Sequence, residues 1–271
     1  MKVEYLTKYP KSILNKGNGY LSHYTHSLNP YTGCVFACSY CYVRRMPVSL
    51  FRDGEWGKWV DIKKNAEELF RKEYKRAKAK GPVSIFMSSS TDPYQPIESK
   101  EKITRSLLEI MSEDPPDFLF VQTRSPLVTR DIDLFSNLRN IRVSVTIETD
   151  KEEMKEAFTP KAPSISSRLK ALKVLTEAQI PTQAAIAPVL PSSESFGELL
   201  AEVTSRVCLD DYFMGDGSNG KRTKSLKIPS MYENLDIEEW YSPDAYKKVH
   251  ENLLHSFTEG QILISKQGFA P

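Results

Sequence analysis

The chain contains 271 residues with a formal net charge of +2, and hydrophobic and charged residues make up 40% and 27% of it. This is the composition of a globular protein, and it excludes a disordered or fibrous chain. No apolar run approaches the roughly 18 residues of a membrane-spanning helix, and the first residues contain no apolar segment typical of a secretion signal. We therefore expect a cytoplasmic protein with no membrane partner.

Apolar runs and helical patterns alternate along the chain. The apolar runs predict strands over 28–32, 83–88, 118–123, 141–147, 182–188, 206–213 and, near the end, 262–264. Helical patterns cover 61–80, 100–112, 131–137, 164–178, 195–204 and 242–257. Continuously apolar strands that alternate with helices indicate an α/β fold, closed or partly closed as a barrel. We expect one structural unit with an N-terminal extension (1–27), a core (28–214) and a C-terminal extension (215–271) packed on the core.

The charge is unevenly distributed. Residues 1–80 contain 16 Lys and Arg against 7 Asp and Glu, whereas residues 81–271 contain 21 against 28. A basic N-terminal part can face the phosphates of a cofactor or of nucleic acid. We favour a simpler interpretation, in which the cations between residues 63 and 80 form the solvated face of one helix.

Three of the four cysteines lie close together in the sequence. Cys34, Cys38 and Cys41 have the spacing C-x3-C-x2-C directly after the first predicted strand, and Cys208 stands apart in an apolar run. In a chain without a secretion signal, such a group is more often a metal or cluster site than a disulfide framework. Thiolates are the usual ligands of iron–sulfur clusters, and three of them leave one iron of a 4Fe–4S cubane open for a substrate or cofactor.

A zinc site is the alternative interpretation of these cysteines. Tetrahedral zinc takes four ligands, and His23 and His26 lie just upstream. We favour the cluster, because the chain has no second cysteine pair that would complete a structural zinc site. For Cys208 we expect a buried, inert thiol.

The cysteine segment resembles the radical S-adenosylmethionine (SAM) superfamily, and the longer string NPYTGCVFACSYCY resembles its branch related to spore photoproduct lyase. Further segments agree in order along the chain: SSSTDPYQPIE, VQTRSPLVTRDIDLF, VSVTIET, PSISSRLKALKVLTEAQIPT and APVLP. The resemblance runs from Asn29 to Pro191. It implies a partial (β/α)6 barrel of the radical SAM type, followed by a C-terminal extension of helices and loops.

The resemblance also implies the cofactors. A 4Fe–4S cluster would bind Cys34, Cys38 and Cys41, and S-adenosyl-L-methionine would bind its open iron. An electron donor of the flavodoxin or ferredoxin type would reduce the cluster, and cleavage of SAM would generate a 5′-deoxyadenosyl radical that abstracts hydrogen from the substrate. The residues that match SAM-contacting positions are Tyr40, Ser88, Ser89, Ser90, Arg124, Ser144 and Pro188.

Each matched residue has an implied role. The backbone of Tyr40 would face the adenine, and one of the three serines would contact the amino group of the methionine moiety. Arg124 stands where the family usually has a Lys near the SAM carboxylate, and an Arg can hold a carboxylate with two hydrogen bonds. Ser144 would reach the ribose hydroxyls, and Pro188 would lie beside the adenine. An ordinary strand-end hydrogen bond is the alternative role of each polar residue.

The chain departs from the pattern at two places. Spore photoproduct lyase carries a hydrogen-donating Cys after the second strand, where this chain reads SSST, and the family's usual acidic residue before Pro160 is Thr159 here. Tyr42 and Tyr94 are nearby alternatives as hydrogen donors. Both departures weaken the transfer of DNA-lesion repair to this chain. The resemblance therefore implies a radical SAM enzyme, and it leaves the substrate open, as well as whether the reaction is of the lyase type or acts on nucleic acid. The alternative is a non-catalytic nucleic-acid-binding module braced by zinc or an iron–sulfur cluster.

Overall fold

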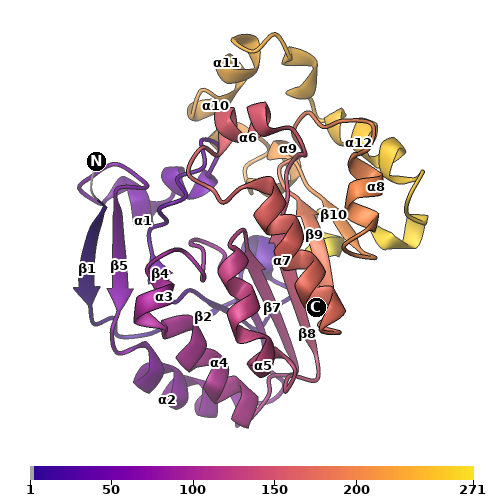
Figure 1. The fold of residues 1–271 in the computed structure, drawn as a ribbon. Coiled ribbons are helices and arrows are strands. Elements are labelled where there is room, and N and C mark those ends of the chain that lie inside the picture. The colour runs from indigo at the N-terminus through magenta and orange to yellow at the C-terminus, as the bar shows by residue number, and fades with distance from the viewer. Residues whose placement is uncertain (1–2) are drawn as a thin grey trace.

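A computed structural model describes residues 3–271, whose strands form two sheets (Figure 1). The larger sheet contains β2 (Leu14–Lys16), β3 (His26–Leu28), β6 (Ser84–Met87), β7 (Phe118–Thr123), β8 (Ile141–Thr146), β9 (Thr182–Ile186), β10 (Val207–Leu209) and β11 (Ile262–Ile264). The smaller sheet contains β1 (Glu4–Lys8), β4 (Tyr31–Thr32) and β5 (Trp59–Lys63). The strand orders are β11-β10-β9-β8-β7-β6-β3-β2 and β1-β5-β4.

Helices follow most strands of the larger sheet. The longest are α2 (Ala66–Lys78), α4 (Ile103–Glu113), α7 (Ile165–Glu177) and α12 (Ala245–Leu253). The shorter ones are α1 (Pro47–Leu50), α3 (Glu98–Glu101), α5 (Ile132–Phe135), α6 (Glu152–Phe158), α8 (Phe196–Ala201), α9 (Tyr212–Gly215), α10 (Lys221–Ser225), α11 (Ile228–Glu233) and α13 (Lys266–Phe269). Five 3₁₀ helices complete the described elements: η1 (Gly19–Leu21), η2 (Tyr42–Arg45), η3 (Pro126–Asp131), η4 (Glu238–Trp240) and η5 (Glu259–Gln261).

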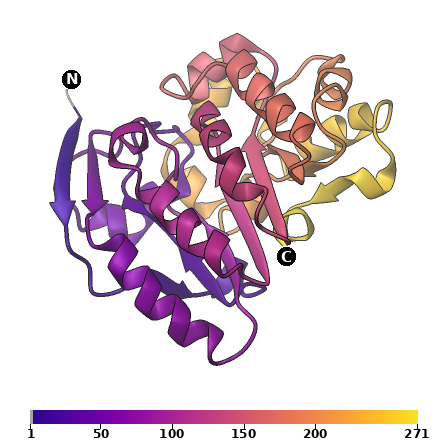
Figure 2. The ribbon, with the colours of Figure 1, turned by 60° about the horizontal axis from the view of Figure 1, so that its bottom comes forward.

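The larger sheet is parallel from β3 to β11, and only β2 runs antiparallel to its neighbour. Its outer strands, β2 and β11, do not pair with each other, so the barrel stays open. The views in Figures 1 and 2 place β1 and β5 on one side of the molecule and the segment around α12 on the other. An α/β fold with a partial barrel is thereby confirmed.

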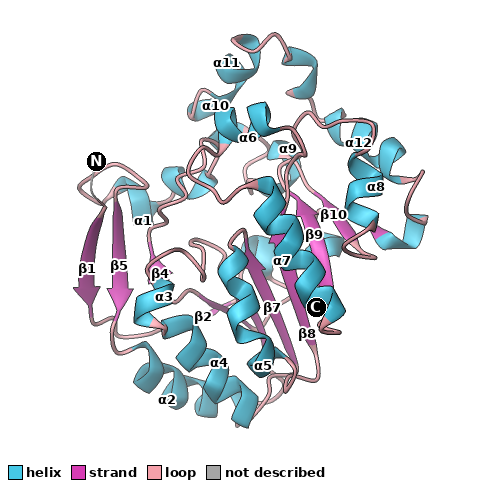
Figure 3. Ribbon diagram, in the orientation of Figure 1, coloured by secondary structure: helices cyan, strands magenta, loops and turns pink. Residues whose placement is uncertain are grey.

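The two faces of the larger sheet bury different side chains. Figure 3 shows α4, α5 and α7 in front of β7 and β8, and on that side Val143 and Val145 belong to the same apolar core as Leu172. On the other face Phe86 and Phe120 stack with their ring centres 5.0 Å apart. Because side chains alternate along a strand, continuously apolar strands supply both cores at once.

The structure corrects three predicted boundaries. The strand predicted over 28–32 is wrong: Asn29 and Pro30 separate β3 from β4, which belong to different sheets. The helix predicted over 61–80 begins only after β5, which pairs with β1 and β4. The strand predicted over 206–213 ends at Leu209, because Asp211 accepts hydrogen bonds from the amides of Phe213 and Met214 and so caps α9.

None of the helices in the described part of the chain has both the length and the apolar character needed to cross a bilayer. The division of the chain at residues 27 and 214 stays a prediction. Elements on both sides of the predicted core pair with it, since β2 adjoins β3 and β11 adjoins β10.

Candidate functional site

The cysteine loop, residues 33–41, leaves the small sheet at β4 and carries three thiols. Cys38 is buried, Cys34 and Cys41 are half-buried, and burial raises the pKa of all three thiols. Gly33 has φ of +85°, and a Cβ there would lie 2.6 Å from the carbonyl oxygen of Trp59. Only glycine tolerates both the left-handed backbone and this close approach, so the residue before Cys34 fixes how the loop begins.

The segment after β6 holds the cysteine loop on both sides of Cys34. The side chain of Gln95 accepts a hydrogen bond from the Val35 amide (3.2 Å) and donates one to the Gly33 carbonyl (3.3 Å). The Thr91 hydroxyl donates to the same carbonyl at 2.5 Å. Gln95 is fully buried, so these bonds are shielded from water and constrain the loop strongly.

Three serines follow β6, and two of them are held by Asn29. The Asn29 side chain accepts a hydrogen bond from the Ser90 amide (3.0 Å) and donates one to the Ser89 hydroxyl (3.3 Å). The Tyr42 hydroxyl donates to the Ser89 carbonyl at 2.6 Å. The Ser88 hydroxyl is buried and has no hydrogen-bond partner among residues 3–271, and Ser88 has a positive φ of 75°. A strained residue with an unpartnered hydroxyl is typical of a functional site.

Arg124, directly after β7, joins the cysteine loop to a buried carboxylate. Its Nη1 donates to Cys38 Sγ (2.9 Å), to Glu148 Oε1 (2.7 Å) and to the Tyr40 hydroxyl (3.3 Å). The other oxygen of Glu148 pairs with Arg168 at 2.5 Å. Burial by itself raises the pKa of Glu148, but Arg168 and Arg124 outweigh it, and the pKa lies at about 2. Glu148 is therefore an anion that holds the Arg124 guanidinium against the thiol of Cys38.

Asp92 positions Arg124 from the backbone side. Its carboxylate accepts hydrogen bonds from the Arg124 amide (2.9 Å), the Thr123 hydroxyl (2.7 Å) and the Tyr94 amide (2.9 Å). Burial raises the pKa of Asp92, while these three donors lower it. One segment, residues 91–95, thus fixes both Cys34 and Arg124.

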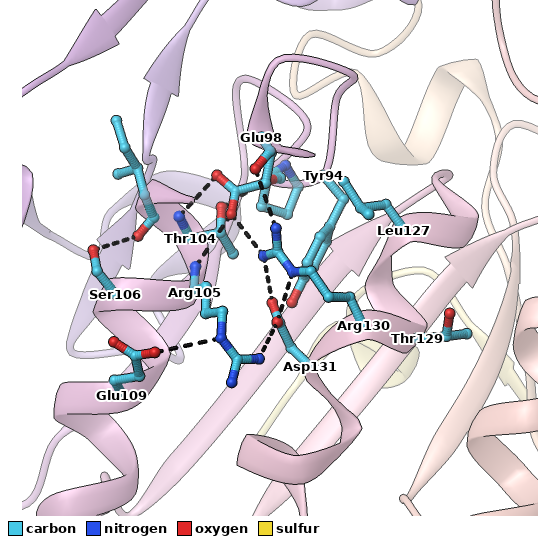
Figure 4. Close-up of polar contacts among 12 residues, drawn as sticks. Tyr94, Glu98, Thr104, Arg105, Ser106, Glu109, Leu127, Thr129, Arg130 and Asp131 are labelled. Carbon is cyan, nitrogen blue, oxygen red and sulfur yellow. Dashed lines mark hydrogen bonds and ion pairs between the residues drawn. The ribbon is translucent and has the colours of Figure 1, made fainter. Parts of the chain in front are cut away.

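A buried ionic network anchors that segment (Figure 4). Glu98 pairs with Arg130 at 2.7 Å, and Arg130 also pairs with Asp131 at 2.7 Å. Arg105 pairs with Asp131 at 2.8 Å, and both carboxylate side chains are fully buried. Glu98 also accepts a hydrogen bond from the hydroxyl of Tyr31, three residues before Cys34. A network in which each buried charge is paired holds its members in one geometry.

Within residues 3–271, neither Ser144 nor Pro188 shares a hydrogen bond with Arg124. Ser144 lies within β8, in register with Gln122 and Gln183, and its hydroxyl accepts a hydrogen bond from the Gln183 side chain at 3.1 Å. Pro188 follows β9, just before the Leu190 amide that bonds to the Glu148 carbonyl at 3.3 Å. The structure therefore brings Tyr40 and Arg124 together at Cys38, places the three serines beside the loop, and leaves Ser144 inside the sheet.

A zinc site does not fit the positions of the side chains. Among residues 3–271, no three His, Cys, Asp or Glu side chains are gathered closely enough to hold one metal ion. His23 is exposed, and His26 is the first residue of β3, at the end of the strand away from the cysteine loop.

The sequence did not single out the residues that support the site. Asn29, Thr91, Asp92 and Gln95 stand inside two of the quoted motifs, and Glu148 is the second-to-last residue of a third. The sequence signal that could have identified these residues is their position just after predicted strands, because polar side chains gather at the carboxyl ends of a parallel sheet.

Solved structures with the same fold include variants of spore photoproduct lyase. A cysteine-to-serine variant of that lyase superposes with a TM-score of 0.67 at 16% identity, over 96% of this chain and 81% of the other. Another variant, with bound AdoMet and dinucleoside spore photoproduct, superposes with a TM-score of 0.65 at 16% identity, with the same coverage of both chains. At this identity the likeness establishes the fold.

Two relatives in sequence are described as uncharacterized proteins. A protein of Methanocaldococcus jannaschii is 38% identical over 243 residues, covering 88% of this chain and 87% of its own length. A protein of Acidianus two-tailed virus is 32% identical over 177 residues, covering 62% of this chain and 57% of its own length. A family model described as the radical SAM superfamily matches residues 28–202, which include the cysteine loop, Arg124 and Glu148. The chain is therefore an enzyme that belongs to the radical SAM superfamily.

Proposed function

We propose that Cys34, Cys38 and Cys41 bind a 4Fe–4S cluster and that SAM binds at its open iron. When bound, the two together supply a 5′-deoxyadenosyl radical, which removes a hydrogen atom from the substrate. The observation that carries the proposal is the contact of 2.9 Å between Arg124 and Cys38 Sγ. It sets a guanidinium, the side chain best suited to a carboxylate, beside the thiols that would hold the cluster.

The residues of this site fit both the 4Fe–4S cluster and SAM. Three thiols lie in one short loop, and one of them already accepts a charge-assisted hydrogen bond. Arg124 uses Nη1 for its contacts with protein side chains, and Nη2 has no such partner among residues 3–271. That nitrogen is the donor we assign to the SAM carboxylate.

Of the three serines, Ser88 is the one we assign to the amino group of SAM. The Ser89 hydroxyl and the Ser90 amide are already bonded to Asn29, whereas the buried Ser88 hydroxyl has no partner. A buried hydroxyl without a partner carries a free-energy cost that a bound donor removes. Ser89 and Ser90 then act by holding the segment in place.

Three further contacts complete the proposed SAM site. Tyr40 presents its backbone to the adenine while its side chain stays bonded to Glu148 at 2.6 Å. Pro188 covers the adenine from the end of β9. Ser144, whose hydroxyl accepts from Gln183 and keeps its own proton to donate, binds the ribose.

Tyr42 is the better placed of the two tyrosines proposed as hydrogen donors. Its hydroxyl bonds to the Ser89 carbonyl, beside the proposed SAM site. Tyr94 lies instead in the network of Figure 4, with the Arg130 guanidinium 5.8 Å from its ring centre. We therefore assign any return of hydrogen to the substrate radical to Tyr42.

The experiment is anaerobic reconstitution with iron and sulfide, followed by chemical reduction in the presence of SAM. We expect 5′-deoxyadenosine and methionine as products from the wild-type protein and from Cys208→Ala, whose thiol is buried far along the chain. Cys38→Ala should yield neither product. Equal product formation by Cys38→Ala and the wild type would refute the assignment.

A further inference from the structure

The outer side of the cysteine loop is covered by one short segment, residues 56–57. Val43, Trp56 and Trp59 form a small apolar cluster, against which Cys34 and Cys41 pack. Gly57 has φ of +90°, and a Cβ there would lie 2.2 Å from the Cβ of Ala37. The chain at Gly57 thus touches the cysteine loop directly, and Trp56 lies between the thiols and the outer surface.

A shallow hollow of about 340 Å³ opens over Trp56. Its lining consists of Arg44, Arg45, Ser49, Trp56, Ser225, Leu226 and Lys227. Three of these residues are cations and none is a carboxylate, and none of the three forms an ion pair within residues 3–271. The Arg45 guanidinium donates to the Ser225 carbonyl at 2.5 Å, which ties η2 to the end of α10.

Exposed apolar side chains adjoin this hollow along the chain. Val48, Leu50 and Phe51 follow the arginines of η2 and are 36%, 55% and 88% exposed. The acidic neighbour Glu55 is already paired with Lys58, so it does not neutralise the cations of the hollow. A basic surface with adjoining apolar side chains is typical of a site where an acidic protein binds.

We propose that this hollow is the docking surface of an acidic electron-donor protein, of the flavodoxin or ferredoxin class. The inference rests on the proposed function, since it needs a cluster at the three cysteines. One electron passes from the reduced donor to the cluster, so the donor is oxidised by one electron and no bond or proton is exchanged. Electron transfer slows steeply with distance, and only Trp56 and its neighbours separate the hollow from Cys34 and Cys41.

The apolar residues decide between an acidic protein and nucleic acid. Phosphate backbones are contacted mainly by charged and polar groups. A nucleic acid that stacked its bases here would need exposed aromatic faces, but Trp56 is only 5% exposed. Leu50 and Phe51 instead offer an apolar contact of the kind found at protein interfaces.

The test compares two reductants on the same reconstituted protein. Arg45→Glu combined with Lys227→Glu reverses the charge of the hollow without touching the cysteines. The matched control is Lys72→Glu combined with Lys75→Glu, two exposed positions on α2 with the same change in net charge. Cluster reduction is followed by stopped-flow absorbance, first with a reduced bacterial flavodoxin and then with a photoreduced deazaflavin, at low ionic strength.

At low salt, we expect the second-order rate constant with flavodoxin to fall at least about tenfold in the hollow variant and by less than about twofold in the control. Both variants should keep the wild-type rate with the deazaflavin. An unchanged flavodoxin rate, or an equal fall with both reductants, would overturn the docking surface. If the hollow variant lost binding to a labelled oligonucleotide but was reduced by flavodoxin at the wild-type rate, the hollow would be a nucleic-acid site and the docking surface would be overturned. Failure of the wild-type protein to form a reducible cluster would instead refute the proposed function.

Discussion

The guanidinium of Arg124 contacts the sulfur of Cys38 at 2.9 Å, across 86 residues of sequence. Glu148 holds the same nitrogen from the other side at 2.7 Å, and Asp92 holds the Arg124 backbone at 2.9 Å. Two carboxylates from different strand ends therefore fix one cation next to one thiol. Such preorganisation is what a site needs in order to bind a charged cofactor without first rearranging.

Replacing Arg124 with Ala should weaken SAM binding and leave the cluster in place. Loss of a charge-assisted contact to a carboxylate predicts an increase in the Kd for SAM of about 10- to 100-fold. Isothermal titration of the anaerobic, reconstituted protein measures this, with iron content as the control. Arg124→Lys should lose less affinity, because it keeps the positive charge. An Arg124→Ala protein with wild-type SAM affinity would show that the guanidinium serves only the fold.

Alanine at Cys34, Cys38 or Cys41 should abolish the 4Fe–4S cluster, because each removes one of only three protein ligands. Cys208→Ala is the matched control, since Cys208 lies within β10, is fully buried and packs against Gly268 of α13. Iron and sulfide analysis after reconstitution distinguishes these three variants from the Cys208→Ala control. Loss of iron from the Cys208 variant would contradict the assignment of three ligands.

Gln95→Leu should loosen the cysteine loop, because it removes both hydrogen bonds to the backbone around Cys34. Unpartnered buried backbone groups predict a loss of about 1–3 kcal/mol in the free energy of unfolding and incomplete uptake of iron. Gln183→Leu makes the same substitution at an equally buried glutamine of β9. That variant should lose stability and still bind iron fully. If both variants took up iron equally, Gln95 would not position the loop.

The strands and the cysteine motif were accessible from the sequence because their signals are local. The predicted strands at Phe118–Thr123 and Ile262–Ile264 agree with β7 and β11 to the residue. The three thiols lie within eight residues of one another, so their spacing alone identified the candidate cluster site. Continuous apolar runs also gave the parallel sheet, since both faces of such a sheet are buried.

Contacts between distant segments were not accessible in the same way. Glu98 and Arg130 are 32 residues apart, and nothing in either neighbourhood indicates that they pair. Residues 59–63 form β5 only because β1 and β4 lie on either side of them, whereas their local pattern continues into the next helix. Pairing between distant segments depends on the whole fold, so local periodicity does not reveal it.

Asp210 should make stability depend on pH. It lies at the end of β10, where the Tyr20 hydroxyl donates to it at 3.2 Å, and burial raises its pKa to about 7. An unfolded Asp titrates at about 3.9. Between the two values the folded protein binds more protons than the unfolded chain, so stability falls as pH rises through this window.

Asp210→Asn removes this titration. At pH 8 the variant should be more stable than the wild type by about 1–3 kcal/mol, and the difference should shrink toward pH 4, where both side chains are neutral. Urea denaturation at a series of pH values measures both curves. Parallel curves for the two proteins would show that Asp210 does not titrate in this range.

The central claim is a cluster with an iron open to SAM, and electron paramagnetic resonance tests it most directly. The protein is reconstituted without oxygen, reduced with dithionite, and measured with and without SAM. We predict the signal of a reduced 4Fe–4S cluster that changes in shape when SAM is added. A cluster signal indifferent to SAM, or a protein that takes up zinc and gives no iron signal, would contradict the account.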